Sequence, residues 1–144
     1  MTEHEVEEGV RQIVLDTNIV LDLLVFNDAA TPPLRDALQA GRLQWVATAP
    51  MRDELERVLA YPQIAKRLAF YGLTGAQVLQ TRDAQVQTVD VPPKASVTCK
   101  DPDDQKFIDL AVAQRCPVLS KDHAVLCMAK RLLALGAAAR AAIE

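Results

Sequence analysis

The alternation of short apolar segments with longer helical patterns is the feature that most constrains the fold. Residues 12–15, QIVL, are apolar on both faces, which is typical of a strand in a parallel sheet that is covered on each side. Comparable segments occupy residues 43–49 and 117–120, and a weaker one occupies residues 86–91. Because helical patterns lie between these segments, the sequence predicts an α/β fold with a parallel sheet.

The helical segments carry recognisable start and stop signals. We expect Thr31 to cap a helix, with Pro32 at its first position and Gly41 just past its end. Pro62 is expected to break a longer helical pattern, and Thr74 to cap the helix that follows. No segment has the composition of a linker between domains.

The length and composition suit one domain with a proper core, since half of the 144 residues are hydrophobic. We assign this domain to residues 11–144 and interpret residues 1–10, MTEHEVEEGV, as a flexible acidic tail. This start is unlike a signal or transit peptide, and no apolar run reaches the ~20 residues of a membrane span. Cys99, Cys116 and Cys127 form no CxxC pair, which fits buried or half-buried thiols in a reducing compartment. We therefore expect a cytoplasmic protein without membrane contact.

Acidic residues recur near the ends of the predicted strands. Asp16 directly follows residues 12–15, and Asp122 lies just past residues 117–120. Sites in open parallel sheets form beyond the carboxyl ends of the strands. Glu54 and Asp104 fall in the first turns of helices that follow or lead into strands, so all four carboxylates are expected at one edge of the sheet.

Asp104 is preferred among the three aspartates of the segment DPDDQKF. Asp101 is a good N-cap, and Asp103 lies at the flank of the apolar stripe of the helix. Asp104 aligns with Phe107 near the middle of the apolar stripe, where a carboxylate is costly unless something pairs with it. Glu54 is a weaker candidate by itself, because an acid in a first helical turn is commonly just solvated.

Four clustered carboxylates would repel one another at neutral pH. A hard divalent cation removes this repulsion, and all-oxygen ligation suits Mg²⁺ or Mn²⁺ rather than zinc. His4 and His123 have no ligand spacing and are interpreted as surface residues. Metals bound in this way activate water and neutralise charge in phosphodiester cleavage.

Four segments together carry a family resemblance: VLDTNIVLDLL, ATAPMRDELERVL, CKDPDDQKFIDLAVA and PVLSKD. In order and spacing they resemble the PIN-domain family of metal-dependent nucleases, especially the bacterial branch that supplies the toxins of toxin–antitoxin pairs. The resemblance implies a three-layer α/β/α sandwich with a central parallel β-sheet. It implies that catalysis and metal binding belong to Asp16, Glu54, Asp104 and Asp122. It also implies a supporting, hydrogen-bonding role for Asn18 and Ser120.

The resemblance further implies a metal-dependent endoribonuclease that hydrolyses RNA with water activated by Mg²⁺ or Mn²⁺. A cognate antitoxin protein is the expected partner, and a homodimer is also compatible with the family. Because the net charge is −3, affinity for RNA must come from local cations rather than from bulk charge. Lys100, Lys106 and Lys121 flank the acids in sequence and are the expected phosphate contacts.

Two alternatives stay open: a catalytically silent PIN-like binding or regulatory module, and a nuclease that acts on structured DNA. A receiver-type domain would need paired acids after the first strand, and a phosphatase with an aspartyl nucleophile would need Asp where Asn18 stands. The chain departs from the family in its last residues, GAAARAAIE, which have helix-forming composition. Family members often close the sheet with a fifth strand, whereas we expect a helix or an incomplete sheet edge here.

Overall fold

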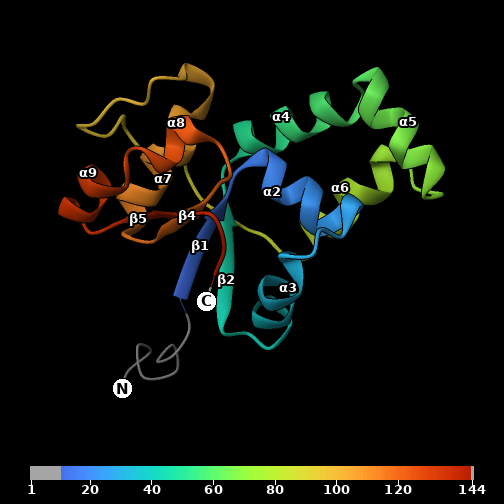
Figure 1. Cartoon of the computed structure of the whole chain (residues 1–144), viewed down its shortest axis with the longest axis horizontal. Helices are drawn as coiled ribbons and strands as arrows, with labels where there is room; N and C mark the ends of the chain where they lie inside the picture. Colours follow the sequence, from blue (N-terminus) through green and yellow to red (C-terminus); the bar gives the residue numbers. More distant parts are fainter. Residues whose placement is uncertain (1–10, 144) are drawn as a thin grey trace.

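The computed structural model describes residues 11–143, so the expected acidic tail, residues 1–10, lies outside the described residues. Five parallel strands form the central sheet in the order β3-β2-β1-β4-β5 (Figure 1). Their bounds are β1 Arg11–Leu15, β2 Leu43–Ala47, β3 Gln87–Thr88, β4 Pro117–Leu119 and β5 Ala138–Arg140. The prediction of a parallel sheet is confirmed, although β3 is shorter than residues 86–91.

Helices cover both faces of the sheet. Successive residues of a strand point to opposite faces, so each strand contributes to a buried cluster on either side. Ile13 and Leu15 of β1 pack into one buried cluster, and Val14 packs into the other. Residues from the first set of helices fill the first cluster: α2 Thr17–Leu21, the π-helix η1 Asp22–Phe26, α3 Thr31–Gln39, α4 Ala49–Leu59, α5 Pro62–Phe70 and α6 Gly75–Asp83.

The second layer of helices follows in the last third of the chain. It consists of α7 Gln105–Gln114, entered through the 3₁₀-helix η2 Pro102–Asp104, and of α8 His123–Leu126 and α9 Ala129–Ala134. Phe107 and Ile108 of α7 are almost fully buried against the sheet in the second cluster. The predicted three-layer α/β/α sandwich is therefore confirmed.

Most of the predicted helix signals hold. Pro62 separates α4 from α5, Thr74 forms a capping box with Gln77, and Gly41 adopts a φ of +77° just past α3. The expectation for Thr31 is wrong by one position, since this residue is the first of α3. Its hydroxyl donates to the carbonyl of Asp28 at 2.7 Å and so fixes the turn before the helix.

The expectation for the C-terminal residues is also wrong, because residues 138–140 form β5 rather than a helix. This strand pairs in parallel with β4, and Ala137 beside it is buried. Pairing with an open sheet edge outweighs the weak intrinsic preference of alanine for helix. β5 also contacts the residue that follows β4, because the backbone N–H of Ser120 donates to the carbonyl of Arg140 at 3.0 Å.

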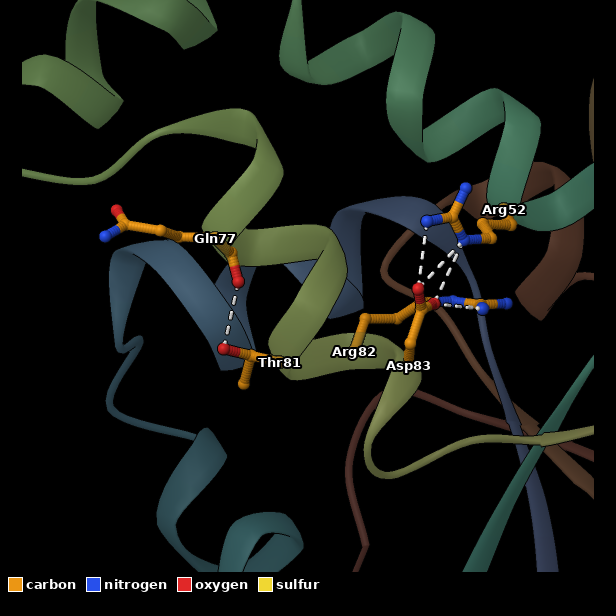
Figure 2. Close-up of polar contacts among 5 residues, drawn as sticks. All are labelled: Arg52, Gln77, Thr81, Arg82 and Asp83. Atoms are coloured by element: carbon orange, nitrogen blue, oxygen red, sulfur yellow. Dashed lines mark hydrogen bonds and ion pairs between the residues drawn. The ribbon is translucent and has the colours of Figure 1, made fainter.

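An ion pair joins α4 to α6 (Figure 2). Arg52 donates from Nε and Nη2 to the carboxylate of Asp83 at 3.0 and 2.9 Å. Arg82 donates to the same carboxylate at 2.9 Å. Since the side chain of Arg82 is buried, this contact compensates a charge that would otherwise be costly inside the protein.

The three cysteines are free thiols, with Cys99 and Cys116 buried and Cys127 exposed. Cys127 therefore differs from the expectation of a buried or half-buried thiol. Within residues 11–143, no helix has the length and apolar character needed to span a membrane.

Candidate metal centre

Asp16 and Asp122 mark the carboxyl ends of two adjacent strands. Asp16 is only 3% exposed and caps α2, where its side chain accepts a hydrogen bond from the N–H of Ile19 at 3.0 Å. Asp122 caps α8 by accepting from the N–H of Ala124 at 2.9 Å. Because β1 pairs with β4, both carboxylates lie at the same edge of the sheet, as the sequence predicts.

Ser120 connects these two acids. Its hydroxyl accepts a hydrogen bond from the backbone N–H of Asp122 at 2.9 Å, and its side chain is fully buried. The same hydroxyl also lowers the pKa of Asp16 against the larger effect of burial. Ser120 thus contacts both acids, and its supporting role in the site stays a prediction.

Asp104 completes a group of three carboxylates. Oxygen atoms of Asp101, Asp104 and Asp122 lie within 4.8 Å of one another; we call these three residues the acidic cluster. Asp104 lies where η2 passes into α7, and Asp101 precedes η2 and accepts from the N–H of Asp103 at 3.0 Å. The capping role expected for Asp101 is confirmed, yet the residue also belongs to the cluster.

One oxygen of Asp104 is buried and unpaired. Its Oδ2 has no hydrogen-bond partner among the described residues. Burial, followed by the adjacent carboxylate of Asp122, raises the pKa of Asp104 from 3.8 to about 7. Burial also raises the pKa of Asp16, and the negative charge of Asp122 adds to this effect. The edge therefore disfavours its own negative charges in the absence of a cation.

Glu54 approaches from α4 but is held by other partners. The hydroxyl of Thr17 donates to its Oε2 at 2.5 Å, and the ammonium group of Lys106 forms an ion pair with Oε1. Glu54 is accordingly not among the three carboxylates that approach within 4.8 Å. The expectation that Glu54 lies in the first turn of its helix is wrong, because α4 already begins at Ala49. The sequence analysis also did not anticipate Thr17 or Lys106 as partners of Glu54.

The three lysines proposed as phosphate contacts differ in their surroundings. Lys106 is occupied by Glu54, and Lys121 forms ion pairs with Asp22 at 2.5 Å and Asp28 at 3.4 Å. Lys100 is exposed and makes no ion pair with any residue from 11 to 143. Of the three, Lys100 has the charge most available to a ligand.

Asn18 has an exposed side chain next to Asp16. No hydrogen bond of this side chain occurs within the described part of the chain, and Asn18 influences Asp16 through its backbone N–H, which lowers the pKa of that acid. Its neighbour Thr17, which contacts Glu54, is the residue that links α2 to α4 here. A small polar residue directly after Asp16 was the only sequence signal for this contact.

The donor set fits a hard divalent cation. Every candidate ligand is a carboxylate oxygen, as Mg²⁺ and Mn²⁺ prefer. The unpaired Oδ2 of Asp104 supplies an acceptor that no described group satisfies. His123 is exposed, which agrees with its interpretation as a surface residue.

Comparison with protein families matches residues 12–124 to the PIN domain. This match covers more than half of the chain and includes Asp16, Glu54, Asp104 and Asp122. The chain belongs to the PIN domain family, whose members are generally metal-dependent nucleases. No curated protein matches the sequence significantly.

Proposed function

We propose that this protein is a Mg²⁺- or Mn²⁺-dependent endoribonuclease and the toxin of a toxin–antitoxin pair. The single observation that carries the nuclease proposal is the acidic cluster. Its three carboxylates approach within 4.8 Å of one another, and the buried Oδ2 of Asp104 has no hydrogen-bond partner among the described residues. Carboxylates held this close repel one another at neutral pH, and a cation or a bound proton offsets that repulsion. Membership of a nuclease family supports the same conclusion.

We propose Asp104 and Asp122 as the main metal ligands. Asp101 and Asp16 are proposed as further ligands of the same site. A bound Mg²⁺ or Mn²⁺ ion would supply Lewis-acid chemistry, which activates water and offsets the charge on a phosphodiester. Ser120 keeps the backbone of Asp122 in place, and the N–H of Ile19 fixes the carboxylate of Asp16. These hydrogen bonds hold the acids in a fixed geometry, so that little reorganisation is needed when a ligand binds.

Glu54 is proposed as an additional ligand that joins the metal site only when substrate binds. Its carboxylate accepts a hydrogen bond from Thr17 and forms an ion pair with Lys106. A phosphate entering the site would compete with Glu54 for the ammonium group of Lys106. Glu54 would then be released toward the cation, which joins substrate binding to completion of the ligand set.

The choice of RNA and the toxin role rest on the likeness of the sequence motifs to the toxin branch of the family. A cognate antitoxin and a cytoplasmic location belong to the same proposal. The toxin role predicts that expression of the chain without its partner arrests growth. Asp104→Asn should relieve that arrest if cleavage causes it.

The test of the nuclease proposal is cleavage of a mixed RNA pool with Mg²⁺ or Mn²⁺ and with EDTA. Asp16→Asn, Asp104→Asn and Asp122→Asn keep the shape of each side chain but remove the negative charge. Because the cation contributes several kcal/mol to the transition state, each variant should cut on the order of a thousandfold more slowly or worse. Asp53→Asn is the matched control, since Asp53 is exposed on the same helix as Glu54.

Equal cutting by the carboxamide variants and the wild type would contradict the proposal. A protein that cuts structured DNA but no RNA would favour the alternative of a nuclease that acts on structured DNA. A protein that cuts neither and still binds a partner chain tightly would be the catalytically silent module.

A further inference from the structure

The exposed aromatic residues gather on one helix. The chain contains six aromatic side chains, of which Trp45 and Phe107 are buried. The three that are strongly exposed are Tyr61 at 48%, Phe70 at 85% and Tyr71 at 43%. All three lie at the two ends of α5, whose bounds are Pro62–Phe70. We call residues 57–72 the α5 arm.

The α5 arm is also cationic. No Asp or Glu occurs between residues 57 and 82, in a chain whose net charge is −3. Arg57, Lys66 and Arg67 are exposed on the arm, and Arg57 and Lys66 form no ion pair within residues 11–143. The arm therefore presents uncompensated positive charge next to its exposed rings.

The rings are held in a defined arrangement. Phe70 and Tyr71 meet edge to face, with ring centroids 5.4 Å apart and planes at 76°. The guanidinium group of Arg67 lies 3.9 Å from the ring centroid of Phe26 and donates to the Tyr71 hydroxyl at 3.4 Å. Leu68 anchors α5 in the first buried cluster. The outer face of Phe70 is thus left open on a fixed support.

The arm is continuous with the acidic edge of the sheet. α4 carries Glu54 at its centre and Arg57 in its second half, and α5 follows directly (Figure 1). The ion pair between Arg52 and Asp83 holds the start of α4 against α6 (Figure 2). A ligand chain that leaves the acidic edge along α4 therefore arrives at Tyr61 and the rings beyond it.

We propose that the α5 arm binds single-stranded RNA, with bases stacked on Phe70 and Tyr71 and phosphates paired with Arg57 and Lys66. This inference rests on the proposed function, because it assigns to the same RNA substrate its second contact surface. Exposed rings interleaved with cations are the surface chemistry of proteins that bind single strands without sequence preference. The cores of protein–protein interfaces are also enriched in aromatic residues and Arg, but they are depleted in Lys, so Lys66 beside the rings is the feature that favours RNA over a protein partner.

Single strands fit this arm better than duplexes do. Stacking on a side chain needs a base whose face is open, and paired bases in an A-form helix are stacked on each other. The short spacing of Phe70 and Tyr71 along the chain suits unpaired bases at the end or in a loop of an RNA.

The experiment measures binding of a fluorescent, mixed-sequence, single-stranded RNA to the whole protein in EDTA, where metal-dependent cutting is absent. Phe70→Ala should weaken binding roughly 5- to 150-fold, the range measured for loss of one stacked base. Phe70→Trp should bind at least as well as wild type, whereas Phe70→Leu, which keeps apolar surface but loses the ring, should be as weak as Phe70→Ala. Leu133→Ala is the matched control, since Leu133 is 70% exposed on α9 away from the arm.

Three results would overturn the inference: unchanged binding by Phe70→Ala, wild-type binding by Phe70→Leu, or equal binding of single-stranded and duplex RNA. A concentration-dependent dimer that Phe70→Ala dissociates without affecting RNA binding would assign the arm to self-association instead. Melting curves are measured for each variant and should match that of the wild type, because Phe70 is 85% exposed. If RNA binding depends on Phe70 but nothing is cut, the nuclease proposal fails alone; if cutting persists and binding ignores Phe70, this inference fails alone.

Discussion

The acidic cluster and the α5 arm are opposite kinds of surface within one chain. The cluster packs like charges together, partly buried, and leaves one oxygen of Asp104 without a partner. The arm exposes positive charges and rings to solvent on a helix without acids. The cluster thus lacks a positive partner for its crowded carboxylates, and the arm lacks a negative partner for its exposed cations.

This difference teaches how an acidic protein can act on a polyanion. Groups that hold a cation must be negative and crowded, and they repel a phosphate backbone until the cation is present. Affinity for the backbone must therefore be placed elsewhere, on a surface separated from the acids. Variants of the two regions should accordingly change different measurements.

The largest expected effect is stabilisation by metal. Mn²⁺ at a hundredfold excess over its Kd should raise the free energy of unfolding by about 2.7 kcal/mol, since it binds the native state alone. Thermal melts with Mn²⁺ and with EDTA measure this shift. Asp104→Asn should lose most of the shift, whereas Phe70→Ala on the α5 arm should keep all of it. Absence of a shift in the intact protein at millimolar Mn²⁺ would contradict the metal centre.

The next effect is on stability against pH without metal. The pKa of Asp104 is raised on folding from 3.8 to about 7, so the native state binds this proton more tightly than the unfolded chain does. The native state should therefore lose stability as pH rises through this window, by on the order of 1 kcal/mol after screening by solvent. Asp104→Asn in EDTA should melt higher than wild type at pH above 7, and the two should converge in acid. Lys66→Gln serves as the control and should retain the wild-type pH dependence; a flat profile for wild type would refute the raised pKa.

A smaller effect concerns the salt dependence of RNA binding. Loss of one phosphate contact to a single strand flattens the slope of log K against log salt by ~0.7. Lys66→Gln and Lys100→Gln should each show this change because both charges lack a carboxylate partner among the described residues. Lys121→Gln should change the slope less, since Asp22 and Asp28 already neutralise Lys121. Equal slopes for all three variants would show that local pairing does not decide which lysine contacts RNA.

The smallest effect is expected for the thiols, which belong to neither region. Burial raises the pKa of Cys116 to about 12, so its thiol stays protonated and unreactive at neutral pH. A variant with Ala at Cys99, Cys116 and Cys127 should cut RNA at the wild-type rate. A folded triple variant without cleavage would mean that a thiol takes part.

The positions of the main strands and acids along the chain could be predicted from sequence because each signal is local. Asp16 follows its own strand directly, and Asp122 follows another, so the topology of a parallel sheet brings them together. Asp104 was identified by the helical period alone. These inferences need no knowledge of distant partners.

The remaining features depend on contacts between distant residues. Lys106 pairs with Glu54 from another layer of the sandwich, and no pattern near either residue indicates this pairing. Asp101 was interpreted as a helix cap, which it is, but its second position in the acidic cluster depends on how β4 places Asp122. β5 was missed because alanine-rich segments prefer helix until a sheet edge is available for pairing.

The central position of β1 has a consequence for synthesis on the ribosome. β1 is made first, yet one of its two neighbours in the sheet is β4, whose pairing joins Val14 to Val118 and Leu15 to Leu119. Such long-range pairing is slow and waits for most of the chain. A nascent chain that ends before Pro117 has neither β4 nor Asp122, so it cannot assemble the acidic cluster. Nearly the whole domain must be translated before Asp16 and Asp122 can lie at the same edge of the sheet. Truncated products therefore lack the acidic cluster.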